Sequence, residues 1–165
     1  MKVRARLIVG VMAILALALP GTAVSAPRCE NVNAHVSELV DCSAEPACTE
    51  AGWVACVKAR VIGTINGSWV EYDPGFGFEL PSFGDTSVWR GESIFETKHG
   101  EIFTISAGIN FWPTYATAGD YFNLEIHAVT GGTGRYEEAT GYILLDLAFL
   151  AGVGEATGQI CWPEE

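Results

Sequence analysis

The sequence from Val129 to Gly141 reads VTGGTGRYEEATG and places four glycines and three threonines in thirteen residues. A phosphate-binding loop of this composition must lead into a helix, whose first N–H groups and dipole hold the anion. Here two glutamates, Glu137 and Glu138, follow the glycines, and the next segment has the pattern of a strand. The stretch also lacks GxGxxG spacing and a following GK[ST]. We therefore interpret it as a corner between two strands.

Glycine suits such a corner because it permits positive φ and close approach of two backbone segments. We expect one tight helical turn over residues 135–139, with Tyr136 folded inward as an apolar plug. The Arg135 side chain is expected to reach carbonyls or a carboxylate at this end of the fold. The positions to which we assign this structural role are Gly131, Gly132, Gly134, Arg135, Tyr136 and Gly141.

Alternation of apolar and polar side chains predicts strands along most of the chain. Residues 57–65 alternate, Asn66-Gly67 marks a two-residue hairpin turn, and residues 68–72 form the returning strand. Further strands are expected over residues 87–97, 101–112, 121–130, 142–150 and 155–162, with a turn at His99-Gly100. Short strands in hairpin succession favour an antiparallel barrel or sandwich, and a barrel removes exposed strand edges.

The corner resembles a known motif, in which GGTGR and an aromatic residue are followed after a short gap by A-x-G. It is similar to the corner shared by allene oxide cyclases, dirigent proteins and their bacterial barrel relatives. The final segment, GEATGQIC over residues 154–161, resembles the last strand of secreted bacterial proteins in this group. The resemblance covers about residues 56–162 and implies an all-β, antiparallel eight-stranded calycin-like barrel. The eighth strand is then expected in residues 36–42 or 77–80.

Residues 1–26 have the layout of a secretory signal peptide, with three basic residues, an apolar run over residues 7–19 and small residues up to Ala26. The apolar run is shorter than the roughly 20 residues that span a bilayer, which disfavours an uncleaved anchor. Cleavage is expected after Ala26, with Ala23 as the alternative. The expected organisation is a signal peptide over residues 1–26, a Cys-rich segment over residues 27–55 and a barrel over residues 56–165. The expected location is secreted or periplasmic.

All five cysteines follow the signal peptide, and cysteines of exported proteins usually pair. Zinc binding is the competing interpretation, but the paired CxxC spacing of structural zinc sites is missing. We expect disulfides among Cys29, Cys42, Cys48 and Cys56 and choose Cys161 as the odd thiol, while the pairing itself stays open. A short helix is expected over residues 33–39.

Without the three basic residues of the signal peptide, six of the nine Lys and Arg residues remain against twenty acidic ones, a net charge near −14. Such a surface repels nucleic acid and anionic membranes. We expect no nucleic-acid partner, no membrane association after cleavage and no cofactor. No metal site is expected either, because the three histidines are scattered and Glu125 and His127 make only two ligands. A small hydrophobic ligand and a second copy of the chain are the candidate partners.

The strand over residues 121–130 has one apolar face and one mixed face. Because Glu and His usually face solvent, we predict that the apolar side chains fill the barrel interior: Phe103, Ile105, Ile109, Phe122, Leu124 and Ile126. In the opposite arrangement the mixed faces line a wet cavity, and the candidate acid–base groups are Glu125, His127, Tyr121, Asn110 and Arg90. The N-terminal segment or a second subunit must then cover the apolar face.

Two functions follow from these arrangements. The first is an exported barrel that binds a small hydrophobic ligand or serves as a scaffold. The alternative, which the resemblance implies, is a cyclase or isomerase acting on a hydrophobic substrate confined in the barrel, with catalytic residues that the motif itself does not identify. A cavity that contains a buried, convergent cluster of polar groups favours the enzyme.

Overall fold

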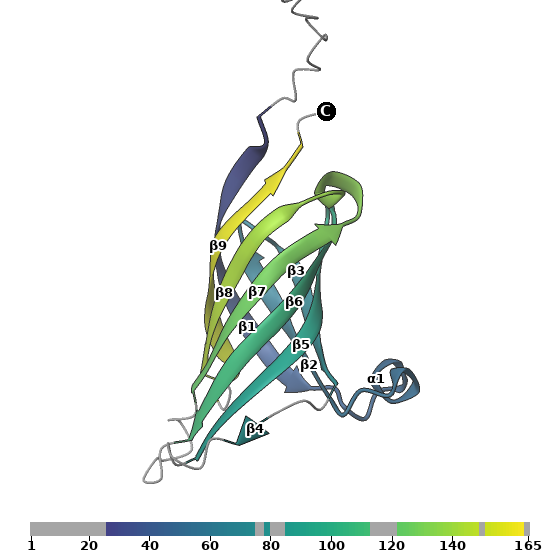
Figure 1. The fold of residues 1–165 in the computed structure, drawn as a ribbon, viewed down its shortest axis with the longest axis vertical. Coiled ribbons are helices and arrows are strands. Elements are labelled where there is room, and N and C mark those ends of the chain that lie inside the picture. Colours follow the sequence, from purple (N-terminus) through teal and green to yellow (C-terminus); the bar gives the residue numbers. More distant parts are fainter. Residues whose placement is uncertain (1–25, 75–77, 80–84, 113–121, 149–150, 164–165) are drawn as a thin grey trace, which may run out of the picture.

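The structure is a computed structural model that describes residues 26–74, 78–79, 85–112, 122–148 and 151–163. Figure 1 shows a fold made almost entirely of strands. The elements in chain order are β1 (Arg28–Asp41), α1 (Pro46–Ala51), β2 (Ala55–Gly63), β3 (Gly67–Asp73), β4 (Phe78–Glu79), β5 (Asp85–Thr97), β6 (Gly100–Trp112), β7 (Phe122–Gly132), the 3₁₀-helix η2 (Gly134–Tyr136), β8 (Thr140–Ala148) and β9 (Val153–Trp162). No helix among these described residues is long and apolar enough to cross a membrane.

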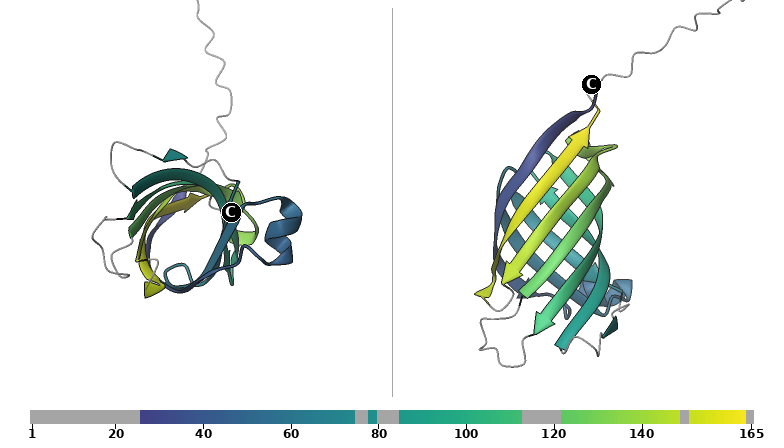
Figure 2. Two further views of the ribbon diagram at one scale, coloured as in Figure 1. Left: turned by 90° about the horizontal axis from the view of Figure 1, so that it is seen from below. Right: turned by 60° about the vertical axis from the view of Figure 1, so that its left-hand side comes forward.

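Eight of the strands form a closed antiparallel barrel, which confirms the predicted fold class. The strand order is β3-β2-β1-β9-β8-β7-β6-β5, and pairing between β3 and β5 closes the ring. The short strand β4 pairs with Ser87 and Val88 near the start of β5, whereas β3 pairs with residues 92–97 of the same strand. Figure 2 shows the ring from one end and the tilt of its strands from the side.

The seven strands predicted from alternation are all present, and β1 is the eighth. It includes most of the segment 36–42 in which a missing strand was expected. The helix predicted over residues 33–39 is wrong, because these residues pair with both β2 and β9. Ala34 and Val36 continue the buried period of two that begins at Val32, and the register shift between Ser37 and Val40 accounts for the buried Leu39. The barrel therefore begins at Arg28 and not at residue 56.

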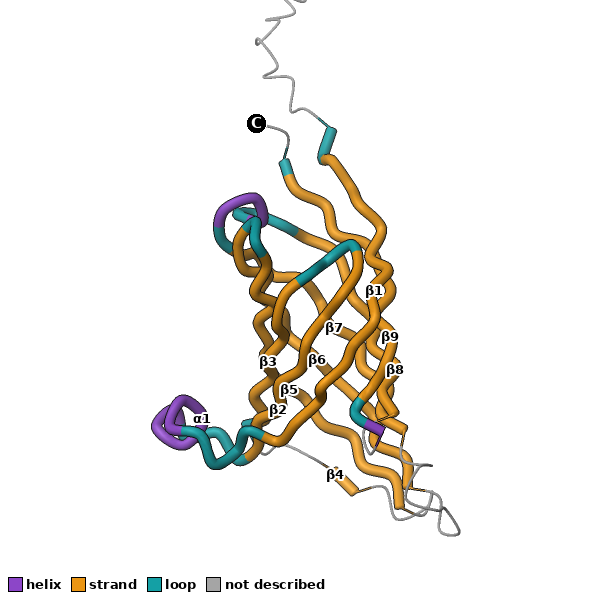
Figure 3. The backbone as a smooth tube through the Cα atoms, turned by 180° about the vertical axis from the view of Figure 1, so that it is seen from behind, coloured by secondary structure: helices purple, strands orange, loops and turns teal. Residues whose placement is uncertain are grey.

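The corner after β7 lies at the same end of the barrel as the turn between β2 and β3 (Figure 3). Gly131 and Gly134 have φ values of 140° and 59°, a conformation that favours glycine. Tyr136 is 4% exposed and packs edge-to-face against Trp162. The Arg135 guanidinium lies 4.0 Å from the centre of the Trp162 ring and donates a hydrogen bond of 2.7 Å to a Glu30 carboxylate oxygen.

The apolar part of the core comes from all eight barrel strands, and β8 provides three of its residues. Ile143, Leu145 and Leu147 are fully buried inside the barrel. In an antiparallel pair, directly opposite residues point to the same side of the sheet. Since Leu145 pairs with Glu125 and Ile143 with His127, the polar residues of β7 must also point inward.

The predicted apolar filling of the interior by β6 and β7 is therefore wrong. Ile105, Ile109, Phe122, Leu124 and Ile126 are 46–57% exposed on the outer face, and Phe103 is half-buried. With Phe111, Tyr142 and Leu144 they form one surface across β6, β7 and β8, which we call the outer apolar face. At roughly 90 Å² for each half-exposed large side chain, this face approaches the 800 Å² or so that each partner buries in a standard interface.

The cysteine-bearing segment lies elsewhere on the outside of the barrel. Cys42, Cys48 and Cys56 pack with Trp53, Val70 and Tyr72 over β2 and β3, so they do not cover the outer apolar face. Disulfides join Cys42 to Cys56 and Cys29 to Cys161. The choice of Cys161 as the odd thiol is wrong, because β1 and β9 pair and bring the two ends of the barrel sequence together. Cys48 is the free, buried cysteine.

Candidate functional site

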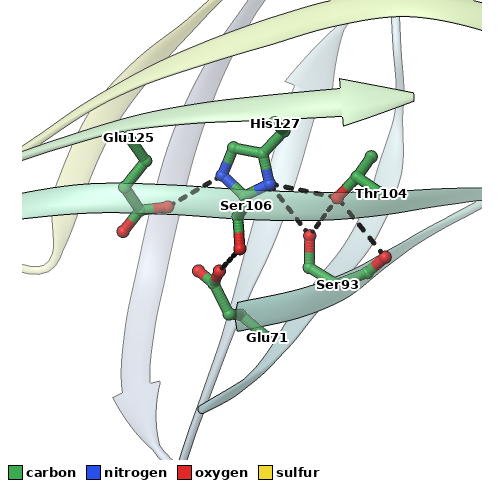
Figure 4. A network of polar contacts seen from close by, with 6 residues as sticks. All are labelled: Glu71, Ser93, Thr104, Ser106, Glu125 and His127. Atoms are coloured by element: carbon green, nitrogen blue, oxygen red, sulfur yellow. Dashed lines mark hydrogen bonds and ion pairs between the residues drawn. The ribbon is translucent and has the colours of Figure 1, made fainter. Parts of the chain in front are cut away.

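The barrel encloses a cluster of polar side chains, none of which is more than 5% exposed. They come from four neighbouring strands, β3, β5, β6 and β7. The members of this interior polar cluster are Glu71, Ser93, Thr104, Ser106, Asn123, Glu125 and His127. Figure 4 shows six of them, all except Asn123.

Strand register brings these residues together although 56 positions separate Glu71 from His127. Glu71 lies opposite Ser93 on the β3–β5 pair, and Ser93 lies opposite Thr104 on the β5–β6 pair. Ser106 lies opposite His127 on the β6–β7 pair. Because opposite residues share a face of the sheet, all these side chains point into the barrel together.

Hydrogen bonds fix the imidazole of His127 from both sides (Figure 4). Its Nε2 lies 2.8 Å from Glu125 Oε2, and its Nδ1 lies 3.0 Å from Ser93 Oγ and 3.1 Å from Thr104 Oγ1. Separately, the Ser106 hydroxyl donates a hydrogen bond to Glu71 Oε1. The rings of Trp69 and Phe95 contact the imidazole edge-on. The ring is therefore held in one orientation by polar and aromatic neighbours.

Burial shifts the proton affinity of all three ionisable groups in the cluster. It raises the pKa of Glu125 to about 8, against the opposing effect of its polar neighbours Glu71 and Asn123. Burial, and next the charge of Glu125, raise the pKa of Glu71 well above its usual range. Burial lowers the pKa of His127. Burial therefore favours the protonated carboxyls and the neutral imidazole over their charged forms.

A pocket of about 170 Å³ adjoins this cluster. Its wall is formed by Ala55, Cys56, Val57, Glu71, Asp73, Trp89, Asn110, Asn123 and Glu125. These residues come from the start of β2, β5 and β7 and from the end of β3 and β6, so the pocket lies at the end of the barrel opposite the glycine corner. Tyr136 is buried at the corner end, whereas Glu71, Asn123 and Glu125 of the cluster reach the pocket wall.

Several polar atoms of the pocket wall have no protein partner. Among the described residues, the buried side-chain atoms without a hydrogen bond are Trp89 Nε1, Glu71 Oε2, Asn110 Oδ1, Asn123 Oδ1 and Trp69 Nε1. All but the last belong to residues that line the pocket. A buried polar atom without a partner costs free energy, so this grouping favours a polar group of a ligand at the same place.

Two inward-facing glycines make room for the site. A Cβ atom at Gly108 would lie 2.4 Å from the Trp89 ring, which covers this position. A Cβ atom at Gly91 would lie 2.9 Å from Glu71 Oε1. Glycine inside a strand often marks such a close approach, and both glycines are signals that the sequence offered.

The structure joins some of the predicted site residues and separates others. Glu125 and His127 form a hydrogen-bonded pair, and Asn110 lines the pocket while donating to Ser87 Oγ at 3.2 Å. Arg90 is exposed on the outer face and lies outside the site, because Gly91 next to it points inward. Tyr121 lies outside the described residues.

The sequence interpretation missed Glu71, although its position two residues after the buried Trp69 places both on one strand face. Glu71, Glu125 and His127 each offer one ligand atom, and these atoms lie within 4.8 Å of one another. The expectation of no metal site considered only Glu125 and His127. The serine and threonine hydroxyls and Trp89 were also missed, since nothing local distinguishes them from other strand residues.

A comparison of the chain with family models, curated proteins and solved structures found no match. The fold and site define a closed eight-stranded antiparallel barrel with a buried carboxyl–histidine cluster beside an interior pocket. The likeness to allene oxide cyclases and dirigent proteins stays a prediction, and the function has to be inferred from the chemistry of the site.

Proposed function

We propose that this chain is an exported barrel protein that binds a small, mainly apolar molecule carrying one oxygen-bearing group in the interior pocket. The observation that carries the proposal is the gathering of four unpartnered polar atoms on the wall of one pocket. Export is supported by two disulfides and by the signal-like residues 1–26, because disulfides persist in oxidising compartments.

The wall chemistry describes the ligand. Trp89 Nε1 can only donate, so its partner is an acceptor such as a carbonyl, ether or hydroxyl oxygen. Ala55, Val57 and the Trp89 ring offer apolar contacts to the rest of the molecule. The volume of about 170 Å³ is below the roughly 300 Å³ at which pockets for drug-sized ligands begin, which limits the ligand to a small molecule.

A second candidate function is a cyclase or isomerase, favoured by the position of Glu125 on the pocket wall and its hydrogen bond to His127. A carboxyl group beside the ligand oxygen can donate a hydrogen bond to it or exchange a proton with the ligand. In a buried site such an interaction is stronger than in water. Confinement of the ligand by the barrel supplies the positioning that a ring closure requires.

The binding proposal can be tested with a matched pair of probes, cyclohexanone and methylcyclohexane. We expect cyclohexanone to shift the indole N–H signal of Trp89 in the NMR spectrum and to bind more tightly than the hydrocarbon. Trp89→Phe keeps an aromatic ring but removes the N–H, and should reduce this preference by about tenfold, the effect of one hydrogen bond. Trp53→Phe, which changes a ring outside the barrel, is the control.

Equal affinity for the two probes, or the same loss in both variants, would contradict binding through Trp89. If neither probe binds the parent protein saturably, the scaffold role is favoured. For the second candidate, Glu125→Gln should abolish any turnover found among epoxides and ketones of this size while leaving the binding of cyclohexanone measurable. Turnover that is unchanged in Glu125→Gln would remove Glu125 from the reaction.

A further inference from the structure

We propose that Glu71, Glu125 and His127 form a binding site for one divalent transition-metal cation of the Zn²⁺ class, at the inner end of the pocket. Their three ligand atoms lie within 4.8 Å of one another, and all three residues are buried. Figure 4 shows the two carboxyl groups converging from different strands toward the imidazole. The inference rests on the proposed function, because the cation would lie between the cluster and the bound molecule.

Charge balance supports a divalent cation. Binding of a cation would displace the protons of the two carboxyls, and two carboxylates with one neutral imidazole carry a charge of −2, which one divalent cation balances. Among the described residues no Lys or Arg is buried, so no side-chain cation from this part of the chain balances the pair within the barrel. A cation bound by all three groups would leave the interior of the barrel neutral.

An independent observation is a buried carboxyl oxygen of Glu71 that has no hydrogen-bond partner. Glu71 is 3% exposed, and its Oε2 makes no hydrogen bond, although its Oε1 accepts one from Ser106. Glu71 is one of the three residues whose ligand atoms converge, and it also lines the pocket. Coordination would satisfy an atom that the protein otherwise leaves unsatisfied.

The hydrogen bonds around the three groups have the pattern that metal ligands require. A ligating histidine bonds its second ring nitrogen to a neighbouring group, which fixes the ring and its tautomer. In this site Nδ1 of His127 contacts the hydroxyls of Ser93 and Thr104. Nε2, which faces Glu125, would then be the nitrogen that binds the cation. The Ser106 hydroxyl orients the Glu71 carboxyl in the same way.

The ligand set also indicates the class of cation and its use. An imidazole nitrogen favours Zn²⁺ and neighbouring transition metals over Mg²⁺ and Ca²⁺, which prefer oxygen ligands. Three protein ligands leave the fourth position of a tetrahedral zinc open, as in catalytic zinc sites. That position would face the pocket, where the cation could polarise the oxygen of the bound molecule as a Lewis acid.

The test uses mature protein, treated with a chelator and dialysed, to which Zn²⁺ is added in a calorimeter. We expect saturable binding of one Zn²⁺ per chain, and with Co²⁺ the visible absorption of a tetrahedral centre. Glu71→Gln and His127→Gln should each weaken Zn²⁺ binding by at least about tenfold. The matched control is His35→Gln, because His35 also lies 3.1 Å from a glutamate but is exposed and has no third ligand among the described residues.

Ser93→Ala addresses the case in which changes of the buried ligands prevent folding. It keeps all three ligands, removes one hydrogen bond to Nδ1, and should weaken Zn²⁺ binding about tenfold. Cys48→Ser should leave binding unchanged, which excludes the free thiol as the ligand. The inference is overturned if the parent protein binds no stoichiometric Zn²⁺, if His35→Gln or Cys48→Ser abolishes binding, or if His127→Gln and Ser93→Ala both retain it.

One experiment distinguishes a failure of the ligand-binding proposal from a failure of the metal-site proposal. The shift of the Trp89 N–H signal by cyclohexanone is measured in chelator-treated protein and again with Zn²⁺. A shift without any Zn²⁺ binding leaves the pocket in place and removes only the cation. Stoichiometric Zn²⁺ binding without a cyclohexanone shift keeps the metal site and removes the proposed ligand.

Discussion

Substitution of Gly134 tests two reasons why the corner between β7 and β8 requires glycine. These are the positive φ and the lack of room for a Cβ atom. The φ of Gly134, 59°, is in the left-handed region, and an added Cβ atom would lie 2.6 Å from the backbone oxygen of His99. Gly52 provides the matched site, since its φ is 77° and a Cβ atom there would have nothing within 4 Å. Substitution by valine therefore adds strain at both positions but a steric clash only at Gly134.

The magnitudes follow from these two contributions. A left-handed conformation costs a residue with a Cβ atom about 1–2 kcal/mol, which is the expected loss for Gly52→Val. Overpacking against a fixed group adds about 1–3 kcal/mol, so Gly134→Val should lose about 2–5 kcal/mol. The carbonyl of His99 cannot easily move, because it accepts the backbone N–H of Arg135 in the same corner.

The free energy of unfolding is measured by urea denaturation of the oxidised protein, and an unchanged m-value shows that the unfolded state is comparable. Our reasoning about the clash is refuted if Gly134→Val and Gly52→Val lose the same free energy. Parent-like stability of Gly134→Val would refute the positive φ itself. A larger loss for Gly52→Val would show that the helix α1 matters more to the fold than the corner does.

Three further predictions concern the disulfide, the outer apolar face and the pocket. Cys161→Ser opens a bridge that spans 132 positions, which should cost up to about 5 kcal/mol of stability in denaturant unfolding if the disulfide acts by restricting the unfolded chain. The outer apolar face is expected to pair with a second copy of this acidic chain: sedimentation should show a dimer or larger oligomer that Leu124→Asp dissociates, whereas Ile62→Asp, on another exposed strand, leaves it intact. A parent protein that stays monomeric at high concentration would contradict this. Gly108→Ala should displace the Trp89 ring and weaken cyclohexanone binding several-fold, and unchanged binding would show that this ring does not form the pocket wall.

Local patterns in the sequence were sufficient to predict most of the strands and their turns. Alternation with a period of two, the Asn66-Gly67 turn and the glycines of the corner each depend on residues close together in the chain. Where the alternation was short and lay among cysteines, as at residues 33–39, the prediction of a helix was wrong. A strand there is stabilised by its two neighbours, β2 and β9, which start 16 or more positions away.

The sequence by itself determined which residues share a face of β7, but not which face points inward. Both arrangements satisfy the alternation, and only the pairing of Glu125 with Leu145 and of His127 with Ile143 decides between them. Polar groups are tolerated inside because residues from four strands satisfy one another there, a condition that no single strand reveals. The pairing of Cys29 with Cys161 and the meeting of Glu71 with His127 have the same origin: closure of the barrel brings together positions that are distant in sequence, and this depends on strand register over the whole chain.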